Sequence, residues 1–146
     1  MKTKSNIKRL SNNKTQKRRL SKNKKTEIIK TFLEILNCAK LYHWSTDSYS
    51  QHKATDDLYS DLNKFIDEFV EIMLGKNKER IYTIDTIQPI KIKNKKQFIS
   101  KIQKFKIYLI NLNDYMDKTF DTNLVNIRDE LLDIDDTVYV RQKKLE

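Results

Sequence analysis

The sequence predicts an all-α protein, a four-helix bundle preceded by a basic tail. The 146-residue chain contains one glycine and one proline, whereas sheets and tight turns usually need more of both. Four segments also repeat large apolar residues at the three- and four-residue spacing of a helix face. The length corresponds to one domain, which we place at residues 26–146, after a tail of residues 1–25.

The predicted tail contains eleven Lys or Arg residues and no acidic residue, whereas the rest of the chain carries 19 basic and 20 acidic side chains. Its few apolar residues cannot offset the entropy of ordering the chain, so we expect disorder. Three roles fit this composition: a nucleic-acid-binding arm, a nuclear localisation signal around Lys17-Arg18-Arg19 and a solubilising tail. The candidate nucleic-acid-binding residues are Lys8, Arg9, Lys14, Lys17, Arg18, Arg19, Lys22, Lys24 and Lys25.

The first helix is predicted over residues 26–44 and the second over residues 50–74. Thr26 is a suitable N-cap for the first helix, and the polar residues 45–48 end it. Gly75 is expected at the C′ position after the second helix. The expected inward-facing residues are Ile28, Phe32, Ile35 and Ala39, then Leu58, Leu62, Phe65, Phe69 and Met73.

Residues 76–95 are predicted to form a long connection, because β-branched residues are frequent there and Pro89 interrupts any helical turn. Two further helices are predicted over residues 96–118 and 123–144. Their expected inward-facing residues are Phe98, Ile102, Phe105, Leu109, Leu112 and Met116, then Leu124, Ile127, Leu131, Ile134 and Val138.

The long middle connection decides the predicted topology. About twenty extended residues reach ~65 Å, whereas a helix of about 23 residues is ~35 Å long. The connection can therefore run the length of the bundle and begin the third helix beside the start of the second. This is the single-crossover arrangement of a ferritin-like four-helix bundle, which is the predicted fold class, although a plain up-down bundle could also carry so long a link.

The composition excludes several classes of site and location. Cys38 is the single cysteine, so neither an intrachain disulfide nor a Cys-based zinc site can form, and we expect the thiol to be packed in the core. No apolar run reaches the ~20 residues of a membrane span, and no apolar segment follows the basic N-terminus as in a signal peptide. We therefore predict an intracellular protein without membrane contact.

Histidine and acidic residues at helical spacing form the candidate chemical site. His52 and Asp56 are four residues apart, and so are Asp67 and Glu71, so each pair shares one face of the second helix. The two pairs lie along one stripe, roughly opposite the apolar stripe. They are ~16 Å apart, which is too far for one chain to place both pairs on a single metal ion.

A homodimer would bring the two pairs together. An antiparallel copy of the second helix, related by a twofold axis near Asp61 and Leu62, would place the first pair of one chain opposite the second pair of the other. Imidazole and carboxylate ligands suit iron as Fe(II), and also Mn or Zn. Alternatively, the acidic residues form an ordinary solvated helix face, and His43 is a satisfied histidine at the edge of the core.

Three short patterns within residues 41–71 stand out: Leu41-Tyr42-His43-Trp44, His52-x-x-x-Asp56 and Asp67-x-x-x-Glu71. Together they resemble the Dps family of ferritin-like mini-ferritins. The resemblance implies an iron-oxidising site at a dimer interface, a basic arm that binds DNA and assembly beyond the dimer. The ligands that it implies are His43, His52, Asp56, Asp67 and Glu71, with Trp44 and Tyr59 as nearby aromatic residues.

Residues 48–56 also resemble an uncharacterised family found in large DNA viruses, which implies a location in the virion, the host cytoplasm or the host nucleus. His43 and His52 stand closer in sequence than in Dps proteins, and this shortening can draw His43 out of the site. Two functions stay open: a Dps-like ferroxidase with a DNA-binding tail, or a non-enzymatic viral bundle, nucleic-acid-binding or structural, with a vestigial metal site. RNA or an import receptor is an alternative to DNA as the partner of the tail.

Overall fold

The computed structural model describes residues 20–144, with side chains up to residue 138. Within this range the chain is all-helical, with four α-helices and no strand. They are α2 (Lys22–Ser45), α3 (Tyr49–Gly75), α4 (Lys95–Asn111) and α5 (Thr122–Lys144), and the short 3-10 helix η1 (Leu112–Tyr115) follows α4. No helix in the described range combines the length and the apolar composition needed to cross a membrane. Most of the predicted tail, residues 1–19, lies outside the described residues.

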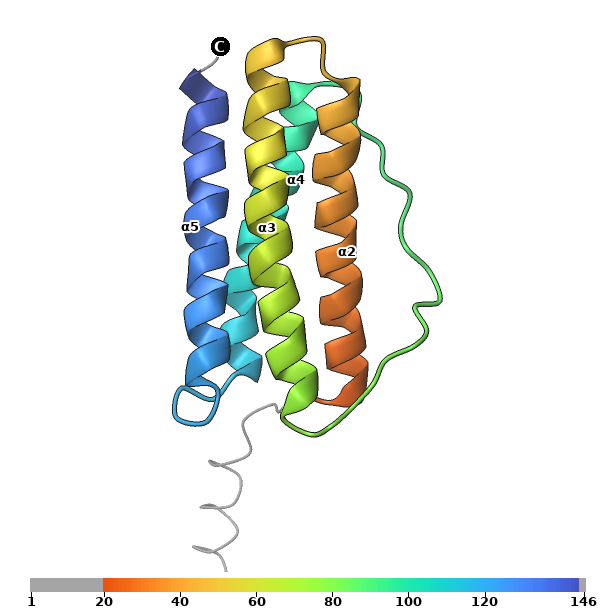
Figure 1. Cartoon of the computed structure of the whole chain (residues 1–146), viewed down its shortest axis with the longest axis vertical. Coiled ribbons are helices and arrows are strands. Elements are labelled where there is room, and N and C mark those ends of the chain that lie inside the picture. Colours follow the sequence, from red (N-terminus) through yellow and green to blue (C-terminus); the bar gives the residue numbers. More distant parts are fainter. Residues whose placement is uncertain (1–19, 145–146) are drawn as a thin grey trace, which may run out of the picture.

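The four helices lie side by side with their axes roughly aligned (Figure 1). α2 packs against α3 and α4, and α5 packs against the same two helices. α3 and α4 run in the same direction, because residues 76–94 return along the outside of the bundle from the end of α3 to the start of α4 (Figure 1). We call this extended segment the 76–94 connection.

The apolar stripes of the four helices meet in one core. Phe32 lies at its centre, with its ring edge-on to those of Phe69 and Phe105 at centroid distances of 5.3 and 6.0 Å. Cys38 is buried in this core, as expected. All the predicted inward-facing residues are buried except three, which pack half-buried against the core: Phe65, Ile134 and Val138.

α2 begins at Lys22, four residues before the predicted start, because Ser21 caps it by accepting a hydrogen bond from Lys24 N at 3.1 Å. Lys25, which the sequence assigned to the nucleic-acid-binding tail, is 2% exposed. Its Nζ pairs with Glu79 Oε1 at 3.2 Å and so ties the start of α2 to the 76–94 connection. The ammonium group of Lys25 is therefore enclosed by the fold and paired with an acid, and is not presented at the surface.

Two other helix ends differ from the prediction. Gly75 is the last residue of α3 and does not adopt the left-handed C′ conformation, which instead occurs at Lys78 with a φ of 52°. α4 ends at Asn111, well before the predicted end at residue 118, and η1 follows it. The tighter 3-10 turn still directs Leu112 and Met116 into the core, so the apolar pattern continues after the α-helix has ended.

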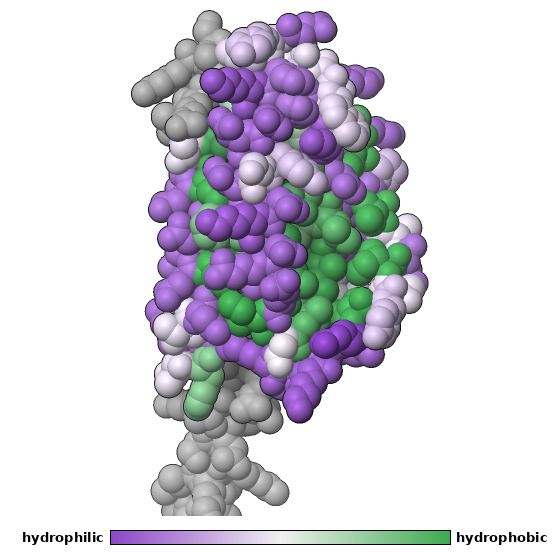
Figure 2. Space-filling view, in the orientation of Figure 1, coloured by the Kyte–Doolittle hydropathy of each residue, from purple (hydrophilic) through white to green (hydrophobic). Residues whose placement is uncertain are grey.

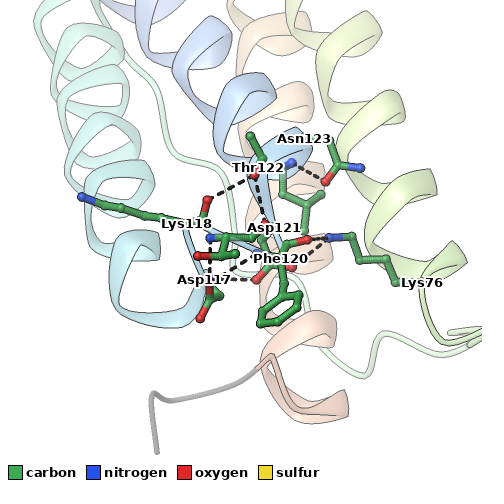
Figure 3. Close-up of polar contacts among 9 residues, drawn as sticks. Lys76, Asp117, Lys118, Phe120, Asp121, Thr122 and Asn123 are labelled. Carbon is green, nitrogen blue, oxygen red and sulfur yellow. Dashed lines mark hydrogen bonds and ion pairs between the residues drawn. The ribbon is translucent and has the colours of Figure 1, made fainter. Parts of the chain in front are cut away.

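A polar network builds the turn before α5 (Figure 3). Lys76 Nζ donates to the Phe120 carbonyl oxygen at 2.8 Å and pairs with Asp121 Oδ1 at 2.9 Å. Asp121 Oδ2 accepts from Asp117 N at 2.8 Å, and Asp117 Oδ1 accepts from Thr119 N at 2.7 Å. The network joins the end of α3 to the start of α5 and so helps to fix how these two helices pack.

Candidate functional site

The end of α2 and the start of α3 bring the two histidines into contact. Residues 46–48 join the helices, and the imidazole rings of His43 and His52 stack with centroids 3.8 Å apart and an interplanar angle of 26°. His43 is 8% exposed, whereas His52 is exposed. The short spacing between the histidines therefore places His43 against His52 instead of drawing it away.

Each imidazole donates its Nδ1–H group to the backbone carbonyl of the other histidine. The distance is 2.8 Å from His43 Nδ1 to the His52 oxygen and 3.0 Å from His52 Nδ1 to the His43 oxygen. A carbonyl oxygen can only accept, so Nδ1 carries the proton in both rings. When the rings are neutral, Nε2 of each therefore holds a lone pair that can bind a proton or a metal ion.

The local sequence explains why this turn is well defined. The His43 carbonyl is among the last four of α2, which lack partners within the helix, and the bond from His52 satisfies it. Gln51 Oε1 accepts from the hydroxyls of Tyr42 and Thr46, the second at 2.9 Å. Three polar side chains therefore hold the two helix ends together, and this fixes the orientation of the stacked rings.

Asp56 lies beside the histidine pair. Its Oδ1 is 4.0 Å from His43 Nε2, and its side chain is 66% exposed. A neutral Nε2 and a carboxylate are both acceptors, so their approach is favourable only with a proton or a cation between them. Metal–nitrogen and metal–oxygen distances of about 2.0–2.2 Å place two such atoms about 3.4 Å apart at a tetrahedral ion, so the 4.0 Å separation would have to shorten slightly for both to bind one ion.

Asp67 and Glu71 are exposed on the same helix but lie further along it: Asp67, the nearer of the two, is ~16 Å from Asp56 and about 22 Å from His52 by helix rise. No group of three or more His, Cys, Asp or Glu side chains within the described part of one chain is arranged to hold a metal ion. The structure thus brings His43 to both His52 and Asp56. It does not bring the second acidic pair to them.

The surface beside the site is aromatic and partly apolar. Lys40 Nζ lies 4.6 Å from the Tyr59 ring centroid and 5.7 Å from that of Trp44, which is 69% exposed. Leu33 and Leu41 also expose more than a third of their surface. Figure 2 shows apolar side chains gathered along α2, next to a largely hydrophilic α3. The sequence named Trp44 and Tyr59, but not Lys40, whose position between them depends on how α2 packs on α3.

The nucleic-acid-binding candidates fall into two groups. Six of them lie outside the described residues: Lys8, Arg9, Lys14, Lys17, Arg18 and Arg19. In the described part, Lys22 is exposed at the start of α2. Lys24 pairs with Glu27 at 2.9 Å and lies 4.0 Å from the Tyr115 ring centroid. These contacts make the ammonium group of Lys24 less available to a phosphate.

Comparison with protein families gives a match over residues 43–140 to a model described as a family of unknown function (DUF5856). The matched region starts at His43 and includes the other four candidate ligands. No curated protein and no solved structure matches the chain. The match therefore marks the helical region that carries the candidate site without giving it a chemistry.

Proposed function

Because the chain belongs to the family of unknown function DUF5856, we propose its function from the site itself: Dps-like binding and oxidation of Fe(II). The observation that carries the proposal is the reciprocal bonding of the two histidines, His43 and His52. Metal-binding histidines usually donate their other ring N–H to a carbonyl or carboxylate, which fixes the tautomer and the ring orientation. Here both rings are held in this way beside the Asp56 carboxylate.

The arrangement of the helices supports a ferritin-like bundle. α3 and α4 run in the same direction and are joined by the 76–94 connection along the outside of the bundle (Figure 1). One long crossover of this kind is the feature that distinguishes ferritin-like bundles from up-down bundles. This likeness to ferritin-like bundles is one of helix topology, and the support for metal chemistry comes from the site alone.

A second copy of the chain would complete the site. Asp67 and Glu71 are exposed, too far from the histidines within one chain, and on the same helix as His52. An antiparallel contact between two α3 helices would place them opposite the histidine pair of the partner. The exposed apolar side chains of α2, among them Leu33, would be covered by such a contact. Larger assemblies can then form from the dimer.

Iron is the substrate in this proposal. Two imidazoles and a carboxylate suit Fe(II), and they leave coordination positions open for an oxidant. Each Fe(II) would give one electron to dioxygen or peroxide and leave as Fe(III). Mn or Zn would compete for the same ligands, because both accept imidazole and carboxylate donors.

Anaerobic loading with Fe(II), followed by desalting and metal analysis, tests the site. We expect about one or two irons per chain, and their loss in the double variant His52→Gln/Asp56→Asn, because it removes an imidazole and a carboxylate from the proposed ligands. Asp57→Asn makes the same chemical change one residue away, on an exposed position, and should retain the iron. Iron retained by the double variant, or absent from the unmodified chain, would contradict the proposal.

Mixed dimers test whether the site is shared between two chains. One chain carries His52→Gln/Asp56→Asn and the other Asp67→Asn/Glu71→Gln, so each variant alone should bind no iron. The mixed dimer contains one site with both halves altered and one with both halves intact. We expect it to recover about half of the iron of the unmodified dimer. No recovery, with both variants folded and dimeric, would rule out a shared site.

We propose DNA binding by the basic segment as a second function. The observation that favours it is the charge distribution: residues 1–25 carry eleven cationic side chains and no acidic one. Deleting residues 1–19 should weaken binding to duplex DNA more than about tenfold at low salt and flatten its salt dependence, because fewer counterions are released. RNA and an import receptor are the alternative ligands of the basic segment, and the same binding assay should include them. Equal binding of the full and shortened chains would favour the alternative, a non-enzymatic structural bundle.

A further inference from the structure

A cavity of about 270 Å³ lies between α2, α4 and the 76–94 connection, and none of the candidate metal ligands lines it. The small side chains of Thr31 and Cys38 leave space on the α2 side. The connection is held over this space by a hydrogen bond from Gln88 N to Glu34 Oε1 at 3.2 Å. The cavity therefore lies between two helices and a strap that spans them, and it opens to solvent along part of its boundary.

Most of the cavity wall is apolar. Ile35 and Phe105 are buried members of the core, and Ile90 packs against it from the connection. Burial raises the pKa of the Cys38 thiol to about 12, only partly opposed by the charge of Lys101, so this wall stays neutral. Engineered apolar cavities of about 150 Å³ accept benzene, so this one has room for roughly ten non-hydrogen atoms.

The polar groups at the cavity are mainly donors. Lys101 and Lys104 lie on adjacent turns of α4, and neither makes an ion pair or hydrogen bond with the part of the chain that the structure describes. The Tyr108 hydroxyl is buried, and within the described residues no group makes a hydrogen bond of good geometry with it, although the Thr31 hydroxyl lies nearby. Burial, with the charge of the neighbouring Glu34 among others, raises the pKa of Tyr108 to about 12, and Thr31 opposes this rise only in part, so the phenol keeps its proton.

We propose that this cavity binds a small amphiphilic monocarboxylate. Its apolar body would lie against Ile35, Phe105 and Ile90, where it replaces water at an apolar wall. Its carboxylate would accept a hydrogen bond from the Tyr108 hydroxyl and pair with the ammonium groups of α4. Glu34 also lines the cavity; one of its carboxylate oxygens accepts from Gln88 N, and its negative charge opposes the bound carboxylate in part, so the two lysines must outweigh it. The buried Tyr108 hydroxyl would thereby gain a hydrogen-bond acceptor, which the protein itself does not supply with good geometry.

Octanoate, which has ten non-hydrogen atoms, is the probe, and calorimetric titration of the full chain is the measurement. We expect saturable binding of about one octanoate per chain, and binding of 1-octanol that is at least about tenfold weaker because it lacks the charge. Binding of both compounds with equal affinity would overturn the proposal, because it would show that the cavity selects only for apolar character. The absence of saturable octanoate binding would overturn it as well.

Two variants test the donors without altering the apolar wall. Tyr108→Phe removes only the hydroxyl and should weaken octanoate binding about three- to tenfold. The double variant Lys101→Gln/Lys104→Gln should weaken it about tenfold or more, and Lys96→Gln, on an exposed position of α4, should leave it unchanged. Circular dichroism checks that each variant is folded. Octanoate bound equally by all four proteins would overturn the assignment to this cavity.

Discussion

Replacing Phe32 with alanine is expected to destabilise the bundle by about 4 kcal/mol, the largest loss from any single apolar truncation that we anticipate. Phe32 is 1% exposed, and its ring is edge-on to Phe69 from α3 and Phe105 from α4. The substitution removes the buried ring, leaves a cavity between three helices and deletes two aromatic contacts. Domains of this size are stable by about 5–15 kcal/mol, so a large share of the folding free energy would be lost.

Phe120→Ala is the matched control for this prediction. Phe120 is 81% exposed in the turn before α5, so the same truncation should change the free energy of unfolding by less than about 0.5 kcal/mol. Urea titrations followed by circular dichroism give both values. A loss below about 1 kcal/mol for Phe32→Ala would mean that the ring does not fill the centre of the core.

The sequence predicted which helices exist better than where they end. A stripe of apolar residues is a property of one segment, and it survives small shifts of a boundary. α2 begins after its Ser21 cap, and the contact of Lys25 with Glu79, which lies far along the sequence, holds this first turn against the 76–94 connection. The end of α4 similarly depends on the 3-10 turn that keeps Leu112 in the core. Such contacts form only after the helices have packed.

The candidate site shows the same division. Helical spacing alone grouped His52 with Asp56. The reciprocal bonds between His43 and His52 were not predictable, because they depend on the angle at which residues 46–48 join α2 to α3. The cavity beside Cys38 was also missed, since it requires the connection to lie across two helices. Neither hydrogen bonds across a turn nor a cavity covered by a connection leaves a recognisable pattern in the sequence of one segment.

A buried acid on α5 was missed for a different reason. The apolar stripe selected Ile134 as an inward-facing residue, whereas Asp135 is 2% exposed and Ile134 only half-buried. Acidic residues are rarely buried, so spacing rules assign them to the surface. Burial, with a smaller contribution from the charge of the neighbouring Asp136, raises the pKa of Asp135 to about 7, and the charge of Lys106 opposes this shift. This carboxyl therefore titrates near neutrality in the folded protein.

Asp135 should make the stability of the bundle depend on pH. In the unfolded chain its pKa is near the ordinary value of 3.8, so between about pH 4 and pH 7 the folded state holds a proton that the unfolded state has released. Stability is then lost as the pH rises through this window, and the penalty is complete above about pH 7. A difference of roughly three pKa units corresponds to a loss of up to about 4 kcal/mol.

Asp135→Asn should remove this penalty, because the amide has nearly the same shape and cannot ionise. We expect the variant to unfold at higher urea than the unmodified protein at pH 8, by up to about 4 kcal/mol in free energy, and at nearly the same urea concentration at pH 4. Asp133→Asn is the control, since Asp133 is exposed on the same helix.

The decisive quantity is the difference between variant and unmodified protein at each pH, which cancels the titration of every other group. A difference that stays constant from pH 4 to pH 8 would mean that the folded protein holds Asp135 ionised throughout, as a packed ion pair with Lys106 would allow.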